Sequence, residues 1–183
     1  QIVPTCWDNE WHLRSVSFNS GRAEQIGIAV SGKLTQMWID DMALYKAGEG
    51  IKYMGERNSD YIRVDYGAEA KVCKDAACLT SNSNFSSGTQ YWKSGNGWKN
   101  GFLSVVSDNN AHGKVLRYGG GEGDGLYYIQ WVNVQPNTTY SFSVDIKILK
   151  SGKGQLVILD DSISHPNPVV AFEFDKDIYG DEW

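Results

Sequence analysis

The sequence predicts an all-β protein, a sandwich or a barrel, and three observations lead to this prediction. Short strand-like segments recur along the chain, and the connections between them are rich in Gly, Asn, Asp and Ser. No window keeps apolar residues at helical spacing for three turns, so residues 68–77 could form a turn or two at most. The length of 183 residues and the hydrophobic content of 41% allow one domain with a sizeable core.

The clearest strand is "YSFSVDIKILK", which begins at Tyr140. Its apolar and polar residues alternate, so five apolar side chains from Tyr140 to Ile148 would share one face of a half-buried strand. The turn cluster "QPNTT" precedes it. In chain order, the other expected strands cover residues 13–18, 24–30, 36–44, 101–107, 114–118, 126–134, 155–159 and 169–174.

Residues 45–80 interrupt this rhythm, because they are polar and charged and only "DYIRVDY" resembles a strand. Structureless connections longer than about 12–15 residues are uncommon inside compact domains. We therefore interpret residues 48–78 as a connector with some order of its own.

The charge distribution excludes two classes of partner. The formal net charge is −5, and Lys and Arg form no cluster, so neither nucleic acid nor an anionic membrane surface is expected to bind. No apolar stretch approaches the roughly 20 residues that span a bilayer.

Three cysteines are present, and two of them flank the short polar loop "CKDAAC". A disulfide between Cys73 and Cys78 is predicted if the compartment is oxidising, which leaves Cys6 free or paired elsewhere. A zinc site at these cysteines is not expected, because no His lies near the pair.

Three stretches resemble carbohydrate-binding modules of the family 4, 9, 16 and 22 type. "SNSNFSSGTQYWKSGNGW" (81–98) is similar to the opening of these modules, and "YYIQWVNVQPNTTYSFSVDIKI" (127–148) is similar to their middle. "MWIDDMALYK" (37–46) is similar to their closing strand. The resemblance implies a β-sandwich of the jelly-roll type.

The order of these stretches is permuted, because the ending precedes the beginning. Residues 79–183 followed by 1–47 would restore the order of the family and make about one module. A circular permutant, an out-of-frame unit of a tandem array and a domain swap all explain this order. We favour a single domain that covers residues 1–183, because an uncompleted half would expose strand edges that aggregate.

Aromatic residues are abundant, with seven Trp and ten Tyr, and they can stack on the apolar faces of sugar rings. The alternation in "GLYYIQWVNV" puts Tyr128 and Gln130 on one face and Ile129 and Trp131 on the other. The first pair is favoured as the binding face and the second as core, although alternation alone leaves this open. The candidate carbohydrate-binding residues are Trp92, Trp98, Tyr127, Tyr128, Gln130 and Trp131.

Asp40 and Asp41 stand together in the closing strand-like stretch. They could simply be solvated edge carboxylates. The resemblance implies instead a structural Ca²⁺, which prefers several oxygen ligands. Its candidate ligands are Asp41, Asp40, Asn84 and Ser87.

These features predict a non-catalytic module that binds a polysaccharide outside the cell or at its surface. The acids in "LDDSISHPNP" and "FDKDIYGDE" are interpreted as solvated loop residues, so no glycoside hydrolysis is expected. The alternative is a structural or adhesive module without a sugar site, which would assemble with neighbouring copies head-to-tail or by domain swapping.

Overall fold

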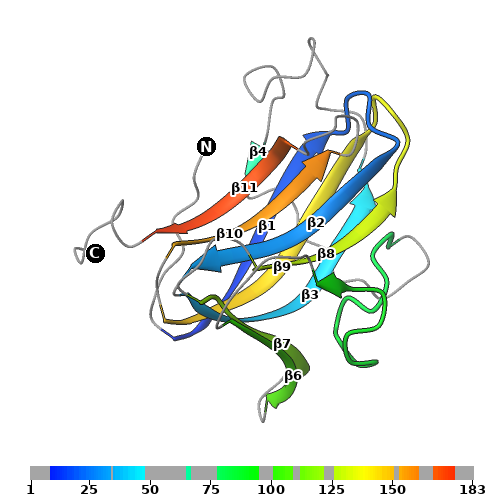
Figure 1. Cartoon of the computed structure of the whole chain (residues 1–183). Helices are drawn as coiled ribbons and strands as arrows, with labels where there is room; N and C mark the ends of the chain where they lie inside the picture. The colour runs from blue at the N-terminus through cyan, green and yellow to red at the C-terminus, as the bar shows by residue number, and fades with distance from the viewer. Residues whose placement is uncertain are drawn as a thin grey trace.

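The all-β sandwich is confirmed by a computed structural model, in which two antiparallel sheets form the two layers (Figure 1). The structure describes residues 9–33, 35–47, 65–66, 78–94, 101–108, 112–121, 126–150, 153–160 and 167–175. Strands and turns account for the regular structure of these residues, and no helix among them is long and apolar enough to cross a membrane.

All nine predicted segments form strands, and two short strands join them. The strands are β1 (Trp11–Asn19), β2 (Gln25–Lys33), β3 (Gln36–Lys46), β4 (Asp65–Tyr66), β5 (Lys93–Ser94), β6 (Phe102–Asp108), β7 (Gly113–Gly119), β8 (Leu126–Asn133), β9 (Thr139–Lys150), β10 (Lys153–Asp160) and β11 (Asn167–Asp175). Strand β4 falls within "DYIRVDY", the one strand-like part of the connector, and pairs with β1.

In both sheets, strands from the first 46 residues lie between later strands. Sheet A has the order β4-β1-β9-β3-β7-β6, so β9 lies between β1 and β3. Sheet B has the order β11-β10-β2-β8-β5, so β2 lies between β10 and β8 (Figure 1). The first three strands are therefore hydrogen-bonded to later strands within one chain.

The core fills the space between the sheets. The apolar residues of β9 face inward, as their alternation predicts, and Phe142 packs in one cluster with Phe18 of β1 and Ile28 of β2. The outward serines of β9 are buried as well, and Ser141 shares a hydrogen bond of 2.6 Å with Ser17 of β1. Such cross-strand hydroxyl pairs add to the stability of a sheet.

A β-bulge in β3 re-aims the two aspartates. The register between β3 and β9 shifts between Asp40 and Ala43, and Asp41 has a φ of 46°. Aspartate tolerates this left-handed conformation better than most residues. Strand β7 pairs with β3 before the bulge, and the segment 78–83 pairs with it after the bulge. There the N–H of Met42 donates to the carbonyl of Ser83 across 3.3 Å.

Candidate functional site

Strand β2 carries small residues on the outer face of sheet B, and its neighbours flank them with larger ones. Gly27 is opposite Trp131 of β8 and Leu159 of β10, and Ala29 is opposite a larger residue on each side. The intervening residues of these strands belong to the core between the sheets. We name this set the outer strip: Gly27, Ala29, Ile129, Trp131, Val157 and Leu159.

Trp131 is the exposed residue of the outer strip, with 39% of its surface accessible, whereas Ala29, Ile129 and Val157 are buried. Its ring lies against the backbone of Gly27. A Cβ added at Gly27 would lie 3.1 Å from the ring of Trp131 and 2.7 Å from the Cδ1 of Ile129. The missing side chain therefore makes room for the indole on the sheet.

Polar groups border the outer strip. The side-chain amide of Gln25 donates to the Oδ1 of Asn133 across 2.8 Å at an exposed position. Lys93 of β5 is exposed and is opposite Ile129. The face thus offers an indole, two amides and an ammonium group to a ligand.

The structure places Tyr128 and Gln130 on the buried face of β8, opposite to the assignment that the sequence favoured. Gln130 makes two hydrogen bonds to the backbone of Ser81: its Oε1 accepts from the N–H across 2.8 Å, and its Nε2 donates to the carbonyl across 2.9 Å. The Tyr128 hydroxyl donates to the carbonyl of Thr89 across 3.2 Å. Both side chains therefore anchor the loop 79–92 to sheet B.

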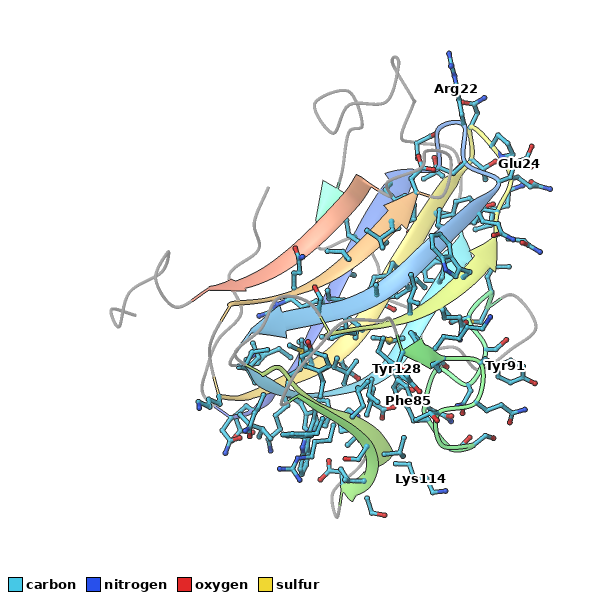
Figure 2. The ribbon with its side chains drawn as sticks, in the orientation of Figure 1. Arg22, Glu24, Phe85, Tyr91, Lys114 and Tyr128 are labelled. Atoms are coloured by element: carbon cyan, nitrogen blue, oxygen red, sulfur yellow. The ribbon has the colours of Figure 1, made fainter. Side chains whose placement is uncertain are left out.

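Trp92 belongs to the same anchor. Its ring is buried and stacks on Tyr128, with ring centroids 5.8 Å apart and an interplanar angle of 17°. Burial raises the pKa of the Tyr128 hydroxyl, opposed by its hydrogen bond to Thr89. Figure 2 shows Phe85 of this loop close to Tyr128, and Tyr91 at the outer edge of the loop. Trp98 lies outside the described residues, and only the backbone of Tyr127 is described.

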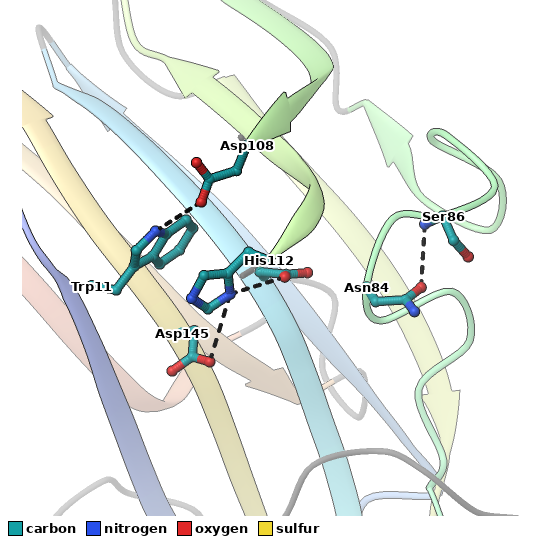
Figure 3. A network of polar contacts seen from close by, with 7 residues as sticks. Trp11, Asn84, Ser86, Asp108, His112 and Asp145 are labelled. Carbon is teal, nitrogen blue, oxygen red and sulfur yellow. Dashed lines mark hydrogen bonds and ion pairs between the residues drawn. The ribbon is translucent and has the colours of Figure 1, made fainter. Parts of the chain in front are cut away.

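A second group of polar side chains lies on the outer face of sheet A (Figure 3). Asp40 of β3 is opposite Asp145 of β9, and His112 comes from the connection between β6 and β7. The Nδ1 of His112 is 3.2 Å from the Oδ2 of Asp40 and 4.0 Å from the Oδ2 of Asp145. With Asp41 these three residues form what we call the acid–histidine cluster.

Trp11 of β1 holds the imidazole from the other side. Its ring stacks on His112, with centroids 4.0 Å apart and an interplanar angle of 25°. Its indole N–H donates to the Oδ2 of Asp108, the last residue of β6, across 3.2 Å (Figure 3). The end of the β6–β7 hairpin is thereby tied to β1.

Burial dominates the electrostatics of the cluster. It raises the pKa of Asp40 to about 6, opposed by a hydrogen bond from the backbone of Asp41; the charge of Asp41 adds to the increase and His112 opposes it. Burial also raises the pKa of Asp145, an effect that His112 opposes. The Oδ1 of Asp40 is buried and has no hydrogen-bond partner among the described residues. The cluster can therefore bind a cation or hold a proton.

Two of the four predicted calcium ligands lie together. Asp40 and Asp41 lie with His112, and one ligand atom from each of the three falls within 4.8 Å of the others. Asn84 accepts a hydrogen bond from the N–H of Ser86 across 3.2 Å, and the N–H of Ser87 donates to Asn82 across 3.0 Å. These hydrogen bonds of Asn84 and Ser87 stay within the loop 79–92.

Cys78 is disulfide-bonded. Its backbone also forms an isolated β-bridge with Tyr45. Cys73, its predicted partner, lies outside the described residues.

The sequence reasoning missed His112, Asp145 and Asp108 as members of a site. The only signal was indirect, because Asp145 occupies an outward position of the clearest alternating strand. Comparison with known proteins found no matching family model, curated protein or solved structure.

Proposed function

We propose that this chain is a non-catalytic carbohydrate-binding module that binds a polysaccharide on the outer strip of sheet B. The observation that carries the proposal is the exposed indole of Trp131, held against Gly27 at the surface of a sheet. The C–H faces of a sugar ring are weakly apolar and stack on such a ring. Ala29, Ile129 and Val157 of the outer strip are themselves buried, so a sugar ring would stack on the accessible part of the Trp131 indole.

The polar border supports the same proposal. Sugar hydroxyls need both donors and acceptors, and the amides of Gln25 and Asn133 provide both. Rigid strands carry Trp131 and Asn133, so the stacking and polar groups keep their spacing. Rigid presentation reduces the entropy that is lost on binding.

The interleaved strands support a permuted module. In our proposal, residues 79–183 and 1–47 make one jelly roll, and residues 48–78 connect them. The disulfide of Cys78 supports an oxidising location, outside the cell or at its surface. Pairing of β1, β2 and β3 with later strands of the same chain favours this closed module over the adhesive alternative.

Affinity electrophoresis against soluble polysaccharides tests the proposal. The panel contains hydroxyethylcellulose, xylan, laminarin, mannan and alginate, so that neutral and anionic chains are both sampled. We expect retardation on at least one, and Trp131→Ala to weaken binding at least about tenfold, or about 1.4 kcal/mol.

Tyr91→Ala is the matched control, because Tyr91 is a 60% exposed aromatic residue on the loop 79–92 and not on the outer strip. It should bind as the unchanged protein does. Absence of retardation on every polysaccharide would contradict carbohydrate binding. Equal retardation of Trp131→Ala and the unchanged protein would place binding elsewhere.

A further inference from the structure

We propose that the acid–histidine cluster on sheet A is a binding site for a divalent transition metal ion of the Zn²⁺ type, and not for Ca²⁺. Its ligands are Asp40 and Asp41 from the β3 bulge and His112 from the connection between β6 and β7. The site lies on the opposite outer face from the strip proposed for sugar, so the two proposals stand independently.

The chemistry of the donors argues against calcium. Ca²⁺ takes six to eight oxygen ligands, whereas the cluster contains an imidazole nitrogen among its few donors. The Oδ1 of Asn84, which would add an oxygen, accepts a hydrogen bond from the N–H of Ser86. Imidazole with carboxylates is instead a ligand set suited to Zn²⁺ and related ions.

The spacing of the donors agrees with a small ion. Zinc binds His nitrogen and carboxylate oxygen at about 2.0–2.2 Å, so neighbouring donors of a tetrahedral site lie roughly 3.3 Å apart. His112 Nδ1 and Asp40 Oδ2 share a hydrogen bond of 3.2 Å in the absence of an ion, and this distance is compatible with that separation. Asp145, with its Oδ2 4.0 Å from the same nitrogen, is the next donor within reach.

The burial of Asp40 is the independent sign of a ligand. Its side chain is 2% exposed, and its Oδ1 has no hydrogen-bond partner among the described residues. A buried carboxylate oxygen without a partner is costly. A cation held between Asp40 and Asp41 would satisfy that oxygen and offset the repulsion between the two charges.

Trp11 provides the support that a metal-binding histidine needs. It stacks on His112 and fixes the plane of the ring, while its indole N–H is engaged by Asp108. Residues that orient a ligating imidazole in this way commonly affect metal affinity. The ion would join β3 to the β6–β7 hairpin, so binding should stabilise the fold.

The test uses the full chain after treatment with EDTA. Isothermal titration calorimetry with ZnCl₂ should show one equivalent bound, and thermal unfolding in ZnCl₂ should show a higher Tm. CaCl₂ at the same concentration should give neither binding nor a change in Tm. Added Co²⁺ should develop the visible absorption of a nitrogen- and oxygen-coordinated ion. His112→Gln should weaken Zn²⁺ binding at least about tenfold, because one of three protein ligands is lost.

His12→Gln is the matched control, since His12 lies on β1 and is not a member of the cluster. It should bind Zn²⁺ as the unchanged protein does. Binding of Ca²⁺ but not Zn²⁺, or equal Zn²⁺ affinity in His112→Gln, would overturn the proposal.

If His112→Gln does not fold, NMR of the unchanged protein decides. Its three histidine imidazoles are assigned with His12→Gln and His165→Gln. Zn²⁺ should shift the His112 resonance, and a shift confined to His12 or His165 would reject the site.

Discussion

The Nδ1 of His112 lies 3.2 Å from the Oδ2 of Asp40, although the two residues are 72 positions apart in the chain. This contact brings the tip of the β6–β7 hairpin to the bulge of β3, and Trp11 covers the imidazole from β1. Two strands and a hairpin thus meet around one buried carboxylate. Its surroundings lead to the first prediction.

Asp40→Asn should change the dependence of stability on pH in metal-free protein. The folded-state pKa of Asp40 is about 6 and its ordinary value is 3.8, so the folded state binds more protons between these values. The unchanged protein therefore loses stability as pH rises from about 4 to about 6, by up to about 3 kcal/mol. Asn cannot ionise, so the variant escapes this loss.

Urea unfolding at pH 4, 5, 6 and 7 in EDTA measures the difference between the two proteins. The neighbours that face Asp40, namely Asp41, His112 and Asp145, remain in both proteins, so the comparison reports the charge of Asp40 together with its effect on them. The free energy of unfolding of Asp40→Asn should gain on that of the unchanged protein as pH rises. A difference that is constant over this range would contradict the prediction.

Gln130→Met should destabilise the protein and leave polysaccharide binding unchanged. The substitution removes both hydrogen bonds to the backbone of Ser81 and leaves that N–H and carbonyl without these partners. Loss of such bonds should cost about 1–3 kcal/mol. The midpoint of urea unfolding measures the cost, and affinity electrophoresis checks binding.

The result for Gln130→Met shows whether Gln130 holds the loop 79–92 to sheet B or contacts the polysaccharide. Trp131→Ala is the opposite case, because it should weaken binding through loss of the exposed part of the indole. If Gln130→Met folds with unchanged stability and loses binding, the buried face of β8 is the sugar site after all.

The chain should be a monomer over a wide range of concentration. Strands β1, β2 and β3 are hydrogen-bonded to later strands of the same chain, so no second copy is needed to supply them. Light scattering after size-exclusion chromatography checks this. A mass that grows with concentration would favour the alternative of head-to-tail or swapped assembly.

The strands were predictable because strand patterning is local. Alternation in β9 depends on residues that follow one another, and the same is true of the turn residues that separate the strands. The face of β8 was not predictable in this way. Both faces carry aromatic or amide residues, and the contact of Gln130 with Ser81 spans 49 positions.

The candidate sites depended on pairings between distant segments. The resemblance pointed to Asp40 and Asp41, but the register of β3 with β9 brought Asp145 beside them, and the hairpin brought His112. No periodicity along the chain encodes such neighbours. Trp131 was identified as a candidate by its residue type, and its exposure followed from the packing of the sheet.

The sequence by itself determined the strands and the short, polar connections between them, because these follow from side-chain alternation and turn chemistry. Only the tertiary structure decided how the strands of residues 11–46 fit among the later strands, which face of β8 is buried and what surrounds Asp40. Those outcomes depend on hydrogen bonds and packing between residues far apart in the chain, which a one-dimensional pattern does not contain.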